Sequence, residues 1–245
     1  MKKSKIIFAG ILLYLISLSS VYAQTAIDYY NRGCDYDKQG NYTQAIADYT
    51  RAIEINPNLA EAYYNRGRVY HIQGNYNQAI SDFTRVIEIR PNDATAYNYR
   101  GAAYNRLDDY SSAIADFNTA IEINPNYAKA YYNRGTAYYK QDNYTQAIVD
   151  YNKFIEIDSN YADAYFYRGF AHYKQDNYTQ AIADLTRAIE IKPNYADAYY
   201  YRVFAYYMIK DYDKAWQDIH KAEELGYAVD PEFLSELKQS SGRDK

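Results

Sequence analysis

Residues 60–93 read AEAYYNRGRVYHIQGNYNQAISDFTRVIEIRPND, and stretches with this pattern recur along most of the chain. Aromatic and small residues such as Tyr63 and Gly67 follow one another at steps of three or four, which is typical of one face of a helix. Gly74 interrupts this periodicity, a second apolar stripe follows, and Pro91 ends it. The stretch therefore predicts two helices joined by a short turn.

The pattern has a period of 34 residues, and several of its columns keep one residue type. A glycine inside a helix costs about 1 kcal/mol relative to alanine, so a recurring glycine predicts a close approach of the two helices. That glycine column consists of Gly33, Gly67, Gly101, Gly135 and Gly169. The predicted units are 26–59, 60–93, 94–127, 128–161, 162–195 and 196–229.

These units resemble the tetratricopeptide repeat, a helix–turn–helix of 34 residues. In the second unit the residues that carry the resemblance are Tyr63, Gly67, Tyr70, Ala79, Phe83, Val86 and Pro91. The resemblance covers residues 26 to about 229 and implies an all-α, right-handed α-solenoid of antiparallel helix pairs, the superhelix of this family. It also implies that the first helices of the repeats line a concave surface that binds peptide segments.

The C-terminal end of the chain predicts a short capping helix over residues 230–239. Asp230 is suited to the N-cap, Pro231 to the first turn, and Phe233 and Leu237 to an apolar stripe that covers the end of the stack. Residues 240–245 are predicted to be a flexible tail.

The first 23 residues have the composition of a secretory signal peptide. A basic start precedes 13 mostly apolar residues, Ile6 to Leu18, and small residues end at Ala23, after which we expect cleavage. The alternative is an uncleaved anchor helix, but the apolar run is shorter than the roughly 20 residues that cross a bilayer. We therefore expect an exported protein, periplasmic or secreted, that does not insert in the membrane after cleavage.

Composition excludes several classes of function. Aromatic residues make up 18% and charged residues 24% of the chain, which argues against a disordered protein. One cysteine and 3 scattered histidines predict neither a metal site nor a cofactor. Removal of residues 1–23 leaves 24 basic and 31 acidic residues, a formal charge of −7, so we expect no nucleic-acid partner.

One departure from the family pattern is systematic. Where the family has leucine before the glycine, this chain has arginine in every unit, and a column in the second helix is always aspartate. We interpret the two columns as Arg–Asp pairs between the helices of each unit; the alternative is that each column is separately solvated. The pairs in the central units are Arg66 with Asp82, Arg100 with Asp116, and Arg134 with Asp150.

On each first helix a second stripe of residues lies one position after the stripe that packs against the second helix. We take this second stripe as the candidate groove. Tyrosine and phenylalanine give a large rigid contact area, which suits recognition of a partner. The alternative for each ring is that it packs between neighbouring repeats. The predicted groove residues are Tyr64, Arg68, His71, Asn98, Lys129, Tyr132, Asn133, Thr136, Tyr139, Phe166, Phe170, Tyr173 and Tyr200.

These observations predict a non-catalytic adaptor that binds a peptide or helix of a partner protein along the groove. The first alternative is a scaffold that builds a multi-protein or self-associated envelope complex through its ends or convex face. The second is an enzyme accessory module or an unrecognised hydrolase, although no nucleophile–base pair or phosphate-binding loop stands out.

Overall fold

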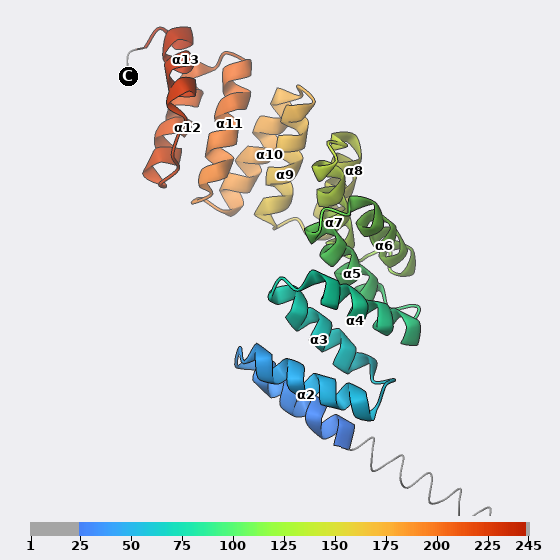
Figure 1. Cartoon of the computed structure of the whole chain (residues 1–245). Helices are drawn as coiled ribbons and strands as arrows, with labels where there is room; N and C mark the ends of the chain where they lie inside the picture. Colours follow the sequence, from blue (N-terminus) through green and yellow to red (C-terminus); the bar gives the residue numbers. More distant parts are fainter. Residues whose placement is uncertain (1–24, 244–245) are drawn as a thin grey trace, which may run out of the picture. The chain divides into compact units, whose positions relative to one another are not determined.

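The structure, a computed structural model, describes residues 25–243, and all regular structure within them is helical (Figure 1). These residues form two compact units, 25–123 and 124–243, which are described separately. The predicted signal peptide, residues 1–23, lies outside the described residues.

The N-terminal unit consists of helix pairs in which each helix packs against the next in the chain. The first helix is described from residue 25 to 38. It is followed by α2 (Tyr42–Ile55), α3 (Ala60–Ile72), α4 (Tyr76–Ile89), α5 (Ala94–Arg106) and α6 (Tyr110–Ile123).

The C-terminal unit repeats this arrangement, and the first helices of its pairs also contact one another, α7 with α9 and α9 with α11. Its helices are α7 (Ala128–Lys140), α8 (Tyr144–Ile157), α9 (Ala162–Lys174), α10 (Tyr178–Ile191), α11 (Ala196–Met208), α12 (Tyr212–Glu224) and α13 (Pro231–Ser241).

The turn inside each pair contains one residue with a positive φ, a conformation that glycine adopts without strain and that aspartate tolerates. The first two turns use Gly40 and Gly74, the next three use Asp108, Asp142 and Asp176, and the last uses Lys210; φ of the four residues other than glycine lies between 57° and 61°. The aspartates also accept a hydrogen bond of 2.5 Å from the hydroxyl of a tyrosine that begins the following helix: Tyr110, Tyr144 and Tyr178. One tyrosine column therefore closes turns.

The glycine column marks the closest approach of the two helices in a pair. A Cβ added at Gly101 would lie 2.8 Å from Cε1 of the buried Phe117, nearer than side chains tolerate. The last pair replaces both members of this contact, since Val203 takes the glycine position and the smaller Ile219 the ring position. In the last pair the smaller side chain of Ile219 thus leaves room for valine at the glycine position.

The arginine and aspartate columns meet in all six pairs of helices. Arg100 donates from Nε to Oδ2 of Asp116 at 2.8 Å and from Nη2 to Oδ1 at 2.7 Å, a bidentate fork. The other five forks have distances between 2.5 and 2.8 Å. In place of the leucine of the family pattern, each pair therefore has an arginine that holds a buried aspartate.

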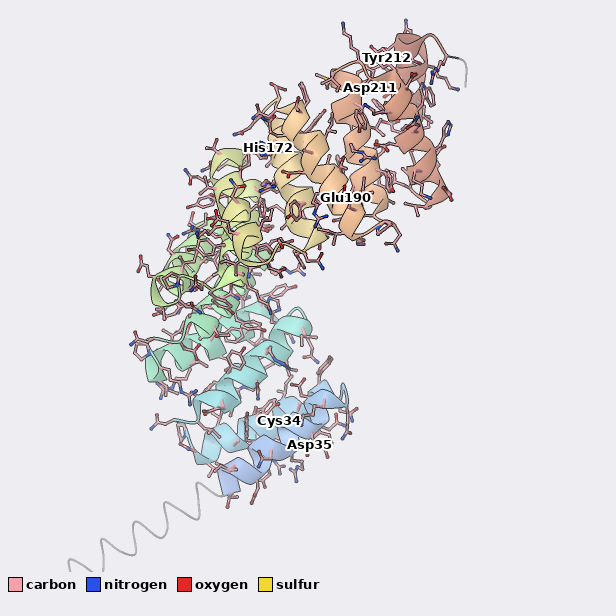
Figure 2. The ribbon with its side chains drawn as sticks, turned by 180° about the vertical axis from the view of Figure 1, so that it is seen from behind. Cys34, Asp35, His172, Glu190, Asp211 and Tyr212 are labelled. Carbon is pink, nitrogen blue, oxygen red and sulfur yellow. The ribbon has the colours of Figure 1, made fainter. Side chains whose placement is uncertain are left out.

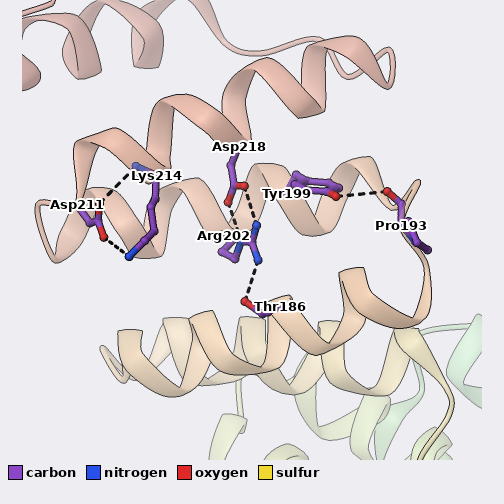
Figure 3. A network of polar contacts seen from close by, with 7 residues as sticks. All are labelled: Thr186, Pro193, Tyr199, Arg202, Asp211, Lys214 and Asp218. Atoms are coloured by element: carbon purple, nitrogen blue, oxygen red, sulfur yellow. Dashed lines mark hydrogen bonds and ion pairs between the residues drawn. The ribbon is translucent and has the colours of Figure 1, made fainter.

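Four of the forks also connect neighbouring repeats within a unit, through Arg66, Arg100, Arg168 and Arg202. Arg202 holds Asp218 with Nε and Nη2, and its Nη1 donates to Thr186 of the preceding helix pair at 2.8 Å (Figure 3). Its guanidinium lies 5.6 Å from the ring centre of Tyr199, a cation–π contact. Burial raises the pKa of the Asp218 carboxyl, and the hydrogen bonds from Arg202 act against that rise.

Helix α13 continues the register of the repeats, because Phe233 and Leu237 fall 34 residues after Tyr199 and Val203. Both side chains are buried against α11 and α12. The helix extends through Ser241, so the tail predicted from residue 240 begins too early. The reason is tertiary, since Trp216 Nε1 donates to Ser241 Oγ at 3.1 Å.

The forks make a prediction for stability. Arg100→Ala and Asp116→Ala should each lower the free energy of unfolding by about 3 kcal/mol, because each leaves a buried charged group without its partner. The double variant should lose less than the sum of the two, with a coupling energy of roughly 1–3 kcal/mol. Urea unfolding followed by circular dichroism measures all four proteins.

The matched control is Lys153→Ala, which removes an exposed pair with Glu156 on the same kind of helix. It should leave the unfolding curve unchanged, because solvent screens such pairs. Strictly additive losses at Arg100 and Asp116 would show that the two columns act independently.

Candidate functional site

The candidate site is a hollow of about 340 Å³ in the C-terminal unit, built by three successive first helices, α7, α9 and α11. Its residues lie on the faces of these helices that the helix pairs leave open, and Tyr195 joins them from the turn before α11. We call it the aromatic groove, and it is lined by Thr136, Tyr139, Lys140, Phe166, Tyr167, Phe170, Tyr195, Asp197 and Tyr201.

The rings of the aromatic groove touch one another in a connected network. Phe170 lies edge-on to Tyr201, with 4.6 Å between ring centres, and 5.8 Å from Tyr139. Tyr139 in turn contacts Tyr167 at 5.8 Å. Edge-to-face rings at these distances stabilise one another, so the surface that they form is preorganised.

A second hollow of about 340 Å³ lies at α7 and α8 in the same unit. Tyr132 lies at its centre and contacts Phe154 and Tyr161, with ring centres 5.3 and 5.4 Å away. Burial raises the pKa of the Tyr132 phenol well above its usual range. Lys129, Asn133 and Asp158 supply the polar part of the lining. Tyr132 is therefore mainly a packing residue with a small accessible surface.

The N-terminal unit has a hollow of different chemistry, with a volume of about 360 Å³. Tyr64 lines it, but the neighbouring groups are largely polar: Asn65 donates to the Tyr30 hydroxyl at 3.1 Å, and Arg90 forms an ion pair with Glu61. The ring network of the C-terminal unit has no counterpart of this size here among the described residues.

The predicted groove residues divide among these places. Thr136, Tyr139, Phe166 and Phe170 line the aromatic groove, whereas Lys129, Tyr132 and Asn133 line the hollow at α7 and α8. Tyr64 lines the hollow of the N-terminal unit, and Tyr200 lines one beside α13. Tyr173 lies at the edge of the ring network, 6.0 Å from Phe170.

Four of the predicted groove residues are covered by neighbours or already hold another side chain. Asn98 is only 4% exposed and Phe166 only 8%, because neighbouring helices cover them, so Asn98 offers no surface to a partner and Phe166 very little. Arg68 is already bound to Asp37, with Nη2 2.6 Å from Oδ2. His71 packs edge-on to Tyr76, and burial lowers the pKa of its imidazole, which favours the neutral form.

The prediction missed five residues that line the aromatic groove: Lys140, Tyr167, Tyr195, Asp197 and Tyr201. Tyr167 and Tyr201 lie one residue after the predicted stripe, and one step along a helix rotates the side chain by about 100°. The signal was present in the sequence, because Tyr99, Tyr167 and Tyr201 share one column of the repeat.

The described residues give little support for other chemistry. Within residues 25–243 no three His, Cys, Asp or Glu side chains come together to hold a metal ion. His172 lies on α9 (Figure 2), where it replaces a framework tyrosine. Its Nε2 is 4.0 Å from Asp184. Burial lowers the pKa of His172. None of the helices in the described part of the chain is long and apolar enough to cross a membrane.

Comparison with protein families gives matches along most of the chain. A family described as TPR repeat matches residues 33–74, 104–142 and 136–176. Two families described as tetratricopeptide repeat match residues 60–93 and 162–195, and residues 185–217. No curated protein matches the chain.

Solved structures show the same fold. The crystal structure of MamA is 28% identical with a TM-score of 0.65, over 71% of this chain and 95% of that one. YrrB, described as a TPR protein with an unusual peptide-binding site, is 25% identical with a TM-score of 0.61, over 71% and 89%. PilF of Pseudomonas aeruginosa has a TM-score of 0.71 over 83% and 93% but is 18% identical, so it shows the fold alone.

The buried phenols predict alkaline instability. Burial raises the pKa of Tyr139 above its usual range, so the folded chain holds the neutral phenol. This contribution to stability is complete below the unfolded value of about 10 and is lost as the pH rises through the folded value. Urea unfolding at pH 8 and pH 10.5 should show the wild type losing stability and Tyr139→Phe losing less. An equal loss in both proteins would contradict the assignment.

Proposed function

The chain belongs to the tetratricopeptide repeat family, and on that premise we propose that it is a non-catalytic adaptor that binds a segment of another protein in the aromatic groove. Proteins built from this repeat generally serve as adaptors. The observation that carries the proposal is the connected ring surface that α7, α9 and α11 present together.

The shape of the aromatic groove favours a chain segment over a small molecule. Packed helices lie about 8–10 Å apart, so a surface across three first helices runs for roughly 20 Å. An extended segment of about six residues spans that distance. The groove is also open and lies on the exposed side of three helices, whereas small-molecule sites enclose most of the ligand.

The lining chemistry suits a peptide. Rings such as Phe170 and Tyr201 offer apolar contact with little loss of side-chain entropy, and Lys140 and Asp197 supply one charge of each sign. The peptide-binding site named for YrrB, a protein with the same fold, adds support by analogy.

A photo-crosslinking experiment tests the site. p-Benzoylphenylalanine placed at Phe170 or Tyr201 should capture one partner in the native host, because both rings line the aromatic groove. The matched control is the same probe at Val149, which is 54% exposed on the second helix α8. Phe170→Ala should weaken binding of the captured partner at least about 10-fold, as loss of an aromatic anchor does.

Capture at Val149 with no capture at Phe170 would contradict the groove and favour the scaffold alternative. Circular dichroism of Phe170→Ala confirms that the variant is folded. A catalytic activity that disappears on substitution of a single histidine would overturn the non-catalytic assignment.

We also propose that the protein is exported, as the first 23 residues predict. The mature chain recovered from the periplasm or medium should begin at Gln24, and Ala23→Leu should block processing because the cleavage site needs a small residue there. N-terminal sequencing of the fractionated protein measures this. An intact Met1 in cytoplasmic protein would contradict export.

A further inference from the structure

A further hollow, of about 540 Å³, lies between α11 and α13 in the C-terminal unit. Phe204 lines it, and its ring centre lies 4.5 Å from that of Phe233 and 4.9 Å from that of Tyr200. We call it the terminal pocket, and its lining is completed by Asp230, Glu232, Ser235, Glu236 and Gln239.

The terminal pocket continues the ring network of the aromatic groove. Tyr201, which lines the groove, lies 5.7 Å from Tyr200 and 6.2 Å from Phe204. A partner segment that crosses α9 and α11 therefore reaches the pocket if it continues toward α13.

The charge of the lining changes along this path. The aromatic groove has one lysine and one aspartate, Lys140 and Asp197, whereas the terminal pocket has three carboxylates and no basic side chain. None of the three carboxylates forms an ion pair within the described residues.

Several exposed acids at the ends of the second helices do have partners. Glu156 pairs with Lys153 at 2.6 Å, and Glu190 pairs with Arg187 at 2.9 Å, each with a base three residues earlier. The terminal pocket thus keeps an uncompensated negative charge beside a wall of rings.

Rings with nearby carboxylates are the surroundings that a guanidinium or ammonium group prefers. The flat face of a ring attracts a cation, and a carboxylate adds a charge-assisted hydrogen bond. The chain makes such contacts itself, since Lys192 Nζ lies 4.1 Å from the ring centre of Tyr195 and Lys174 Nζ 5.3 Å from that of Phe170. Both contacts are made by rings of the aromatic groove, to whose ring network the terminal pocket is joined.

We propose that the partner segment carries an arginine or lysine side chain that enters the terminal pocket, while its apolar side chains lie in the aromatic groove. This inference rests on the proposed function and specifies the chemistry of the partner. The two subsites lie about one repeat apart, roughly 10 Å, so the basic residue follows or precedes the apolar anchor by about three residues in an extended segment.

Selection from a display library of random 12-residue peptides tests this on the purified full chain. Peptides bound by the wild type should be enriched in aromatic or aliphatic residues together with Arg or Lys about three positions away. The double variant Glu232→Gln, Glu236→Gln should lose the basic enrichment, and a peptide selected on the wild type should bind it roughly 3- to 10-fold more weakly. Gln at position 236 can still accept the hydrogen bond from the Tyr207 hydroxyl.

The control variant Glu156→Gln, Glu190→Gln also removes two negative charges but lies outside both subsites, and it should bind the peptide as the wild type does. Selected peptides that need Phe170 but contain no basic residue, or that bind the Glu232→Gln, Glu236→Gln variant unchanged, would overturn this inference and leave the proposed function standing. Failure to select any peptide, or peptide binding that is unchanged in the Phe170→Ala variant, would overturn both the inference and the proposed function.

Discussion

The buried fork between arginine and aspartate is the interaction on which the stack of repeats depends. A carboxylate such as Asp116 is removed from water by the helix pair, and only a bidentate partner of fixed geometry offsets that cost. The same guanidinium reaches back to the preceding pair, as Arg100 does to Thr84 at 3.1 Å. One side chain therefore joins two helices within a repeat and also joins that repeat to its neighbour.

The fork leaves the exposed stripe of the first helices free to vary, although the framework of the repeats is uniform. The fork, the glycine–ring contact and the tyrosines that close the turns lie within each repeat or between adjacent ones, so they leave the exposed stripe of the first helices free. In the N-terminal unit the exposed side of the first helices makes polar contacts around Asn65, whereas in the C-terminal unit it presents rings around Phe170. The composition of the stripe can therefore change from repeat to repeat while the framework contacts stay the same.

Sequence alone predicted the parts of the structure that repeat. The 34-residue period placed the helices, and the coincidence of two columns indicated that Arg100 lies near Asp116. The exposed face of the first helices was harder to predict. Spacing assigns a stripe only to within one residue, and one residue corresponds to a rotation of about 100° on a helix. Asn98 was assigned to the groove on this spacing but is covered, and Tyr167 and Tyr201 were left out although they line it. Which rings remain open depends on contacts between repeats, and no single column contains that information.

The terminal helix shows how capping and recognition use the same residues. Because α13 stands in the register of a first helix, Phe233 and Leu237 complete the core as framework residues do. Among the described residues no second helix packs over α13, and its remaining face is exposed and polar. Glu232 and Glu236 lie on this face, and the helix places them beside Phe204 and Tyr200. The polar face of α13 therefore places carboxylates where the ring surface ends. Neutral polar side chains on this face would also be compatible with water, but they would not attract a cation.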